Sequence, residues 1–217
     1  MDSSNSISKE NVIYVGDPMC SWCWGIAPEL KKLREFAIGN DMNFSIVVGG
    51  LRPGGGDPWD AQMKEFLEHH WNEVLARTGQ PFGYDLFKLD DFNYDTEPAC
   101  RAVVAARPQV GIRELEFFEN VQRKFYVESQ DPGKLVFYQS ICEAMEISFD
   151  IFSKNFNSEG IQRLTNEEFI MNRKWGVKGY PTVLFGSNNE LKLITNGYIS
   201  SDVMIQRVQH YISEKNI

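Results

Sequence analysis

Two short hydrophobic runs near the start of the chain flank a segment whose apolar residues have helical spacing. Residues 12–15 form a continuous apolar run that stops at Gly16, and a second run covers residues 44–48. An uninterrupted run such as the first is typical of a strand that is buried on both faces. Between them, the apolar residues of 27–37 recur at helical intervals. The pattern predicts a strand–helix–strand unit whose two strands are parallel.

From about residue 59 to about residue 175, the apolar residues recur at the spacing of a helix. Thr96 is followed by a proline two positions later, which is typical of a helix start. Asp131, followed directly by Pro132, opens another helical pattern. We expect helices over 63–75, from 97, over 115–125, from 131, over 149–156 and over 166–175. These elements predict an inserted all-helical domain over residues 58–175.

The strand pattern returns only in the last part of the chain. Residues 182–185 (Thr-Val-Leu-Phe) have the composition of a strand, residues 186–189 have that of a turn, and residues 191–194 complete a hairpin before a last helix. The order of elements is therefore βαβ, several helices and ββα. This order predicts an α/β fold with a mixed four-stranded sheet. We expect residues 10–57 and 176–217 to form one domain around the helical insertion.

The composition excludes several classes of protein. The 217 residues carry 22 Lys and Arg against 30 Asp and Glu, a net charge of −8, which argues against nucleic-acid binding and against a basic membrane patch. No apolar run reaches the roughly 18–20 residues that span a bilayer, and the start of the chain is too polar for a secretory signal. We therefore expect a cytoplasmic protein with no membrane partner. Four cysteines are too few for a disulfide scaffold, so the fold depends on its core.

Two of the cysteines form the motif Cys20-Ser21-Trp22-Cys23, where the first expected strand leads into the first helix. Free backbone N–H groups and the helix dipole stabilise a thiolate at a helix N-terminus. Cys20 is therefore the expected nucleophile, and Cys23, one turn further, can attack a mixed disulfide on Cys20. A zinc site is the alternative, but zinc needs four ligands, and the three histidines follow no metal motif. We expect a redox pair and no metal.

A proline directly before the third expected strand is the second candidate feature. Pro181 cannot donate a hydrogen bond to a sheet, so it belongs at an edge or in a tight turn. If its peptide bond is cis, the loop presents the backbone of Tyr180 to an extended substrate; an ordinary trans-proline turn is the alternative. We count Tyr180 and Thr182 among the substrate-binding residues. Trp22 and Trp24 add apolar surface that binds substrate or covers the seam with the helices, with Trp22 expected exposed and Trp24 buried.

Four segments carry a resemblance to a known family: DPMCSWCWG, DTEPACRAV, KFYVE and GVKGYPT. Together they resemble the DsbA family of thiol–disulfide oxidoreductases, in the predicted protein-disulfide isomerase branch of the thioredoxin superfamily. The resemblance covers nearly the whole chain and implies a thioredoxin-like fold with an inserted helical domain. It implies that Cys20 is the nucleophile, Cys23 the resolving cysteine and Pro181 a cis-proline facing them, while Pro28 bends the active-site helix. The implied partner is a thiol- or disulfide-bearing protein or peptide.

The chain departs from its relatives around the motif itself. The dipeptide Ser21-Trp22 is neither Gly-Pro nor Pro-His, so the direction of electron flow stays open, although a reducing cytosol favours a reductase or isomerase. Tyr14 stands where many superfamily members have a buried acid. Asp17 is then the nearest carboxylate, and it can either assist proton transfer to Cys23 or cap the turn.

Two other functions stay open. Related kappa-class glutathione transferases and hydroxychromene-carboxylate isomerases usually have serine in place of the first cysteine; such a function would need Arg52, otherwise a residue of a solvated turn, to contact glutathione. We expect no resident cofactor, with glutathione as a possible co-substrate. A redox-regulated chaperone or adaptor would use the tryptophan surface without catalysis. Cys100 and Cys142 lie on apolar faces of separate helices, where we expect buried free thiols, with a second disulfide as the alternative.

Overall fold

The computed structural model describes residues 9–187 and 190–215. Its strands form one sheet in the order β2-β1-β3-β4, made of β1 (Asn11–Gly16), β2 (Asn43–Val48), β3 (Thr182–Ser187) and β4 (Glu190–Asn196). β2 runs parallel to β1, whereas β3 runs antiparallel to both β1 and β4. The mixed four-stranded sheet predicted from the sequence is confirmed. β1 lies inside the sheet and ends directly before the loop that carries Cys20.

The segment between β1 and β2 forms two helices rather than one. α1 (Ser21–Gly25) and α2 (Ala27–Gly39) are separated by Ile26, and Pro28 lies in the first turn of α2. Proline has no N–H to donate, and the first turn is the part of a helix where that N–H is not needed. The helix expected after Cys20 is therefore divided at the place where Pro28 implied a bend.

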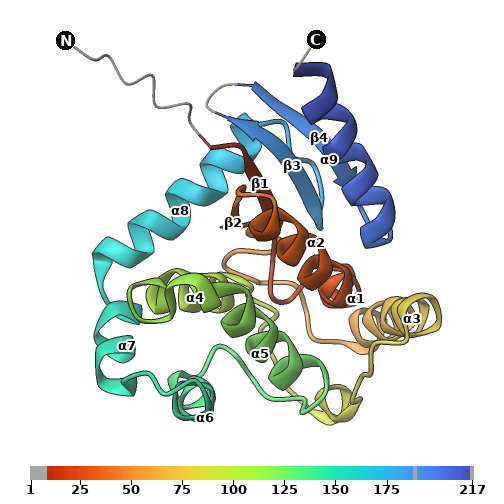
Figure 1. Ribbon diagram of the computed structural model, residues 1–217. Helices are drawn as coiled ribbons and strands as arrows, with labels where there is room; N and C mark the ends of the chain where they lie inside the picture. Colours follow the sequence, from red (N-terminus) through yellow and green to blue (C-terminus); the bar gives the residue numbers. More distant parts are fainter. Residues whose placement is uncertain (1–8, 188–189, 216–217) are drawn as a thin grey trace.

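Helices fill the chain between β2 and β3 (Figure 1). They are α3 (Ala61–Thr78), α4 (Glu97–Val110), α5 (Glu114–Tyr126), α6 (Gln139–Ala144), α7 (Phe149–Phe156) and α8 (Glu159–Lys174), with the 3₁₀ turns η1 (Asp85–Lys88), η2 (Gly111–Arg113) and η3 (Leu135–Tyr138). One cluster of buried side chains runs from the sheet into these helices without interruption. The division into a separate domain over residues 58–175 stays a prediction.

The two faces of the sheet belong to different hydrophobic clusters. Val12 and Tyr14 point into the main core, which also holds residues of α2 and of the last helix, α9 (Ser201–Lys215). Ile13 and Val15 point to the other face, where Met171 of α8 packs on them. Because successive strand residues face opposite sides, β1 is buried on both, as its unbroken apolar run predicts.

Two helix starts differ from the sequence prediction. The carboxylate of Asp131 accepts a hydrogen bond from the N–H of Gly133 (2.8 Å), so this segment forms a turn, and helical structure begins only at Leu135. α8 begins well before residue 166, because Ser158 caps it by accepting a hydrogen bond from the N–H of Ile161 (3.2 Å).

The hairpin also differs in detail from its prediction. Gly186 and Ser187, expected in the turn, continue β3, where Gly186 has a φ of 147° that favours glycine. The expected turn residues 188–189 lie outside the described residues.

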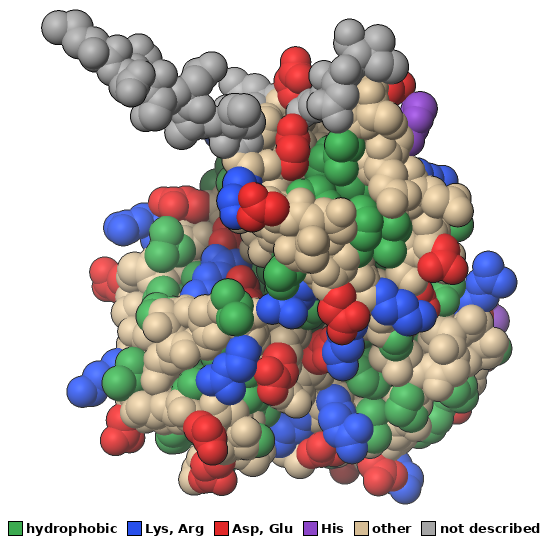
Figure 2. Space-filling model, viewed as in Figure 1, with side chains coloured by type: hydrophobic (Ala, Val, Ile, Leu, Met, Phe, Trp, Pro, Cys, Tyr) green, Lys and Arg blue, Asp and Glu red, His purple; other side chains and the backbone are tan. Residues whose placement is uncertain are grey.

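The visible surface carries acidic and basic side chains interspersed with one another rather than gathered by sign (Figure 2). Among the helices of the described residues, none combines the length and apolar character needed to cross a bilayer.

Candidate active site

Cys20 occupies the N-cap position of α1, with extended backbone angles (φ −90°, ψ 117°). Its carbonyl accepts hydrogen bonds from the N–H groups of Cys23 (2.9 Å) and Trp24 (3.1 Å), which closes the first turn. Both thiols are free, and so are those of Cys100 and Cys142, as expected. Cys20 retains 6 % exposure, whereas Cys23 is completely buried. The first cysteine is thus the one that an incoming disulfide can reach.

The loop before β3 lies directly beside the Cys20 thiol. The peptide bond between Tyr180 and Pro181 is cis, the first of the two geometries considered from the sequence. The Sγ of Cys20 donates to the backbone carbonyl of Tyr180 at 3.4 Å. The loop is held by the Thr182 hydroxyl, which donates to the carbonyl of Gly179 (2.7 Å). The structure therefore brings the motif and this proline loop together.

The side chain of Tyr180 is anchored away from the thiols. Its hydroxyl donates to the carbonyl of Gly49 (2.6 Å), and its ring lies so close to Gly49 that an added Cβ would meet it at 2.6 Å. The buried amide of Asn172 donates to the carbonyls of Val48 and Gly49 (both 3.1 Å). Asn172 thus joins α8 to the end of β2, a role that a single polar residue in a helical pattern does not reveal.

The two tryptophans of the motif have different surroundings. Trp24 is buried, as expected; its indole N–H donates to the carbonyl of Pro81 (3.0 Å), and its ring stacks on Tyr126 at a centroid distance of 6.3 Å. Trp22 is half-buried rather than exposed and lies 6.4 Å from the ring of Tyr198. Trp22 therefore contributes the accessible apolar surface at the motif, and the binding role of either ring stays a prediction.

Asp17 is completely buried and organises the loop between β1 and α1. Its carboxylate accepts hydrogen bonds from the N–H groups of Met19 (2.8 Å) and Leu51 (2.7 Å) and from the thiol of Cys100 (3.4 Å). Burial raises the pKa of Asp17, and these hydrogen bonds oppose the rise. The turn-capping role considered from the sequence is present, and proton transfer to Cys23 stays a prediction. The contact with Cys100 was not predicted.

Burial also determines the protonation state of Cys23, the second thiol of the motif. It raises the pKa of Cys23 well above its usual value, and the neighbouring Cys20 raises it further, whereas the Tyr14 hydroxyl and the backbone of Asp17 oppose the rise. Cys23 is thus held as a protonated thiol at neutral pH. This state suits a resolving cysteine, which acts only after a mixed disulfide has formed.

The side chains of two further candidates, Arg52 and His69, already form contacts within the protein. Arg52 forms an ion pair with Asp57 and lies 5.9 Å from the ring centroid of Tyr94. His69 pairs with Glu73 on the surface of α3 at 3.4 Å. Within the residues that the structure describes, no group of three or more His, Cys, Asp or Glu side chains is arranged to hold a metal ion.

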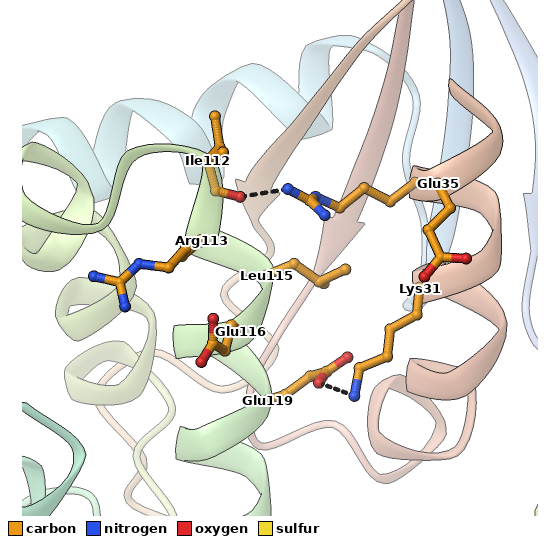
Figure 3. Close-up of a pocket in the computed structure, with 8 residues that line it drawn as sticks. Lys31, Glu35, Ile112, Arg113, Leu115, Glu116 and Glu119 are labelled. Atoms are coloured by element: carbon orange, nitrogen blue, oxygen red, sulfur yellow. Dashed lines mark hydrogen bonds and ion pairs between the residues drawn. The ribbon is translucent and has the colours of Figure 1, made fainter. Parts of the chain in front are cut away.

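A groove of about 420 Å³ on the flank of the molecule lies between α2 and α5 (Figure 3). Lys31 forms an ion pair with Glu119 across it at 2.7 Å, and Arg34 donates to the carbonyl of Ile112 at 2.7 Å. None of the four cysteines lines this groove. It is therefore separate from the thiol site.

Comparison with known proteins agrees with this geometry. The family profile described as thioredoxin matches residues 13–206 of the chain. The chain belongs to the thioredoxin family. It is also similar to the crystal structure of a candidate protein disulfide isomerase from Nitrosomonas europaea, with 31 % identity, a TM-score of 0.87, and coverage of 95 % of this chain and 98 % of that one. This thioredoxin-family chain therefore has the DsbA-like fold with inserted helices that the sequence resemblance implies.

More distant similarities include one solved structure and curated proteins that match in sequence. The cytosolic disulfide reductase DsbM from Pseudomonas aeruginosa, solved with GSH, is 20 % identical, with a TM-score of 0.68 and coverage of 95 % of this chain and 97 % of that one. Among curated proteins, the ClpXP adapter protein SpxH of Halalkalibacterium halodurans is 24 % identical over 92 % of this chain. The chain spans 66 % of that adapter's length and 56 % of its Bacillus subtilis counterpart.

Proposed function

We propose that the protein is a thiol–disulfide oxidoreductase that exchanges disulfides with proteins, peptides or small thiols through Cys20 and Cys23. One observation carries the proposal: the less buried thiol of the motif, that of Cys20 at a helix N-cap, lies 3.4 Å from the carbonyl that precedes cis-Pro181. A substrate strand running along that loop would present its disulfide to Cys20. Support comes from the similarity to disulfide oxidoreductases over nearly the whole chain.

The reaction proceeds in two exchanges. The Cys20 thiolate attacks one sulfur of the substrate disulfide, forms a mixed disulfide and releases the other sulfur as a thiol after protonation. The Cys23 sulfur then attacks Cys20, releases the second substrate sulfur as a thiol and leaves the Cys20–Cys23 disulfide. The reverse sequence oxidises a substrate dithiol. In both directions the substrate and the enzyme exchange two electrons, and no bound cofactor is consumed.

We propose that the chain acts in the cytoplasm, where it reduces or isomerises the disulfides of its substrates. The similar DsbM is a cytosolic disulfide reductase, and the cytosol keeps thiols reduced. A Cys20–Cys23 potential near about −270 mV would fit a reductant, whereas one near about −120 mV would indicate an oxidant. Equilibration with glutathione redox buffers measures this potential.

The test of the activity is insulin reduction and the refolding of a scrambled disulfide protein. We expect the purified chain to catalyse at least one of these reactions and Cys20→Ser to abolish the catalysis. Cys142→Ala is the matched control, because it removes a buried thiol of α6 outside the motif. Equal activity of Cys20→Ser and the native chain would refute the assignment.

A protein-binding adapter is the second candidate, favoured by the similarity to the SpxH proteins. In this function the half-buried Trp22 would contact a protein partner without exchange chemistry. The adapter function predicts partner binding that survives the double change Cys20→Ser and Cys23→Ser, whereas the oxidoreductase predicts loss of covalent capture.

A glutathione-dependent transferase or isomerase has weaker support. Its proposed contact, Arg52, already forms an ion pair with Asp57. Saturable glutathione binding in the Cys20→Ser variant, lost on Arg52→Ala, would favour this function over disulfide exchange.

A further inference from the structure

A buried phenol lies next to the resolving thiol and interacts with it without forming a well-aligned hydrogen bond. Tyr14, on the central strand β1, is completely buried, and its ring packs edge-on against Phe118 of α5 with centroids 5.5 Å apart. Within residues 9–187 and 190–215, no group meets its hydroxyl at hydrogen-bonding geometry. An unpaired buried hydroxyl costs about 1–3 kcal/mol of folding free energy. Such a group needs an explanation, and a role in catalysis is one.

The position of the phenol is fixed by the strand itself. The hydroxyl lies over Gly16, two residues further along β1, so closely that a Cβ there would overlap the phenol. Gly16 therefore provides the space through which Tyr14 reaches the end of the strand. The phenol is thus directed to the side of the sheet where α1 begins.

The neighbour at that end is Cys23. Burial raises the pKa of Tyr14 well above its normal range, and Cys23 adds most to that rise, ahead of Cys20 and Asp17. Tyr14 thus keeps its proton at neutral pH and acts as the donor toward a thiolate, which has no proton to give. Of the nearby groups, Cys23 is the one that must lose its proton during the exchange while remaining completely buried.

We propose that Tyr14 is a positioning residue for the resolving step, whose hydroxyl donates a hydrogen bond to the Cys23 sulfur as that sulfur becomes a thiolate. This inference rests on the proposed thiol–disulfide exchange. In the step, the bond between the Cys20 and substrate sulfurs breaks and the Cys20–Cys23 bond forms. The proton of Cys23 goes to the departing substrate sulfur, or to water where that sulfur leaves as a stable thiolate, and Tyr14 keeps its own proton throughout.

The test separates the two exchanges with the chromogenic disulfide DTNB. The reduced full-length chain is mixed with DTNB in a stopped-flow instrument, and the released chromophore is followed over a range of pH. The first phase reports attack by Cys20; the second, first-order phase reports attack by Cys23 and is assigned by its absence in Cys23→Ser. For Tyr14→Phe we expect a second phase slowed roughly 10- to 100-fold at neutral pH, with its pH profile moved to higher pH. The first phase should change less than about twofold, because its nucleophile is Cys20.

The matched control is Tyr126→Phe, which removes the hydroxyl of another fully buried tyrosine that lacks a partner at hydrogen-bonding geometry. Both phases should keep their native rates in this variant. Tyr14→Phe should also unfold at a urea concentration equal to or higher than that of the native chain, since the lost hydroxyl makes no well-aligned hydrogen bond in the reduced state. If the residue had only a packing role, its replacement would lower this midpoint and leave the pH profile in place.

The outcomes are distinct. A second phase of native rate and pH profile in Tyr14→Phe would overturn the inference while leaving the oxidoreductase intact. Absence of the second phase in the native chain would refute the proposed function and the inference with it. If the phenylalanine variant does not fold, fluorotyrosine at position 14 replaces it. That residue is a stronger donor and should move the pH profile of the second phase to lower pH; an unchanged profile would contradict the proposal.

Discussion

The thiol of Cys20 lies 3.4 Å from the backbone carbonyl of Tyr180, although 160 residues separate the two in the chain. The antiparallel pairing of β1 with β3 produces this contact, because it places the start of β3 beside the end of β1. The Tyr180 side chain is engaged with Gly49, so this residue offers the site its backbone rather than its ring. Recognition through backbone groups would accept substrates of varied sequence.

Replacing the resolving cysteine should trap the intermediate. In Cys23→Ser, we expect Cys20 to react with oxidised glutathione and to retain one glutathione as a mixed disulfide, because no second thiol of the motif can release it. Intact-protein mass spectrometry before and after dithiothreitol treatment measures the adduct. Cys20→Ser is the control and should gain no glutathione at the motif. An adduct that forms equally in Cys20→Ser would assign the nucleophile to another cysteine.

Asn172 should be essential for stability although it lies outside the motif. Asn172→Ala leaves the buried carbonyls of Val48 and Gly49 without the amide that now contacts both, which should lower the free energy of unfolding by about 1–3 kcal/mol. Urea denaturation measures the loss. Asn166→Ala, an exposed position of the same helix, is the control and should change stability by less than about 0.5 kcal/mol. Equal midpoints for both variants would show that the α8–β2 contact contributes nothing.

Much of the fold could be predicted because its elements have local signals. The apolar run of β1 and the apolar helical repeat of α5 predict those elements within a few residues. The break at Ile26 was implied only by Pro28, and the late start of helical structure at Leu135 depends on a side-chain hydrogen bond of Asp131. Boundaries of this kind follow from single contacts that hydrophobic periodicity does not contain.

The sequence predicted the two motif cysteines, the proline loop that faces them and the turn at Asp17, but not the other groups around the thiols. The spacing of the two motif cysteines is visible in the sequence, whereas the groups around them come from segments far apart in it. Leu51 and Cys100 reach Asp17 from the end of β2 and from α4, and no local pattern links them. For the same reason the sequence shows that Tyr14 replaces an acid, but not that its buried hydroxyl lies beside Cys23.

Gly49 should tolerate no side chain. In Gly49→Ala, the added Cβ would meet the Tyr180 ring at 2.6 Å, which forces the ring away and with it the loop before β3. We expect a loss of about 1–3 kcal/mol in unfolding free energy and slower insulin reduction, since the carbonyl beside Cys20 moves too. Gly39→Ala, in α2 with no atom near the added Cβ, is the control and should leave the native stability unchanged or raise it. Native activity and stability of Gly49→Ala would show that the loop adapts freely.

Comparing the native chain with Asp17→Asn should show that Asp17 makes the free energy of unfolding depend on pH. An amide has one acceptor oxygen in place of two, so either the contact to Met19 or those to Leu51 and Cys100 are lost, at a cost of about 1–3 kcal/mol. Because burial raises the pKa of Asp17, the folded state binds more protons than the unfolded state between the ordinary aspartate pKa of about 3.9 and the higher folded value. The contribution of Asp17 is therefore fully present below the ordinary value and declines as pH rises through the folded one.

The difference in unfolding free energy between the native chain and Asp17→Asn should accordingly be largest at acidic pH and smaller at neutral pH. Urea unfolding of both proteins between about pH 4 and pH 7 measures it. Asp91→Asn, an exposed carboxyl, is the control and should give a difference near zero across this range. A difference that grows toward neutral pH would mean that the hydrogen bonds to the carboxylate outweigh its burial, and that Asp17 is ionised more readily in the folded protein than in the unfolded chain.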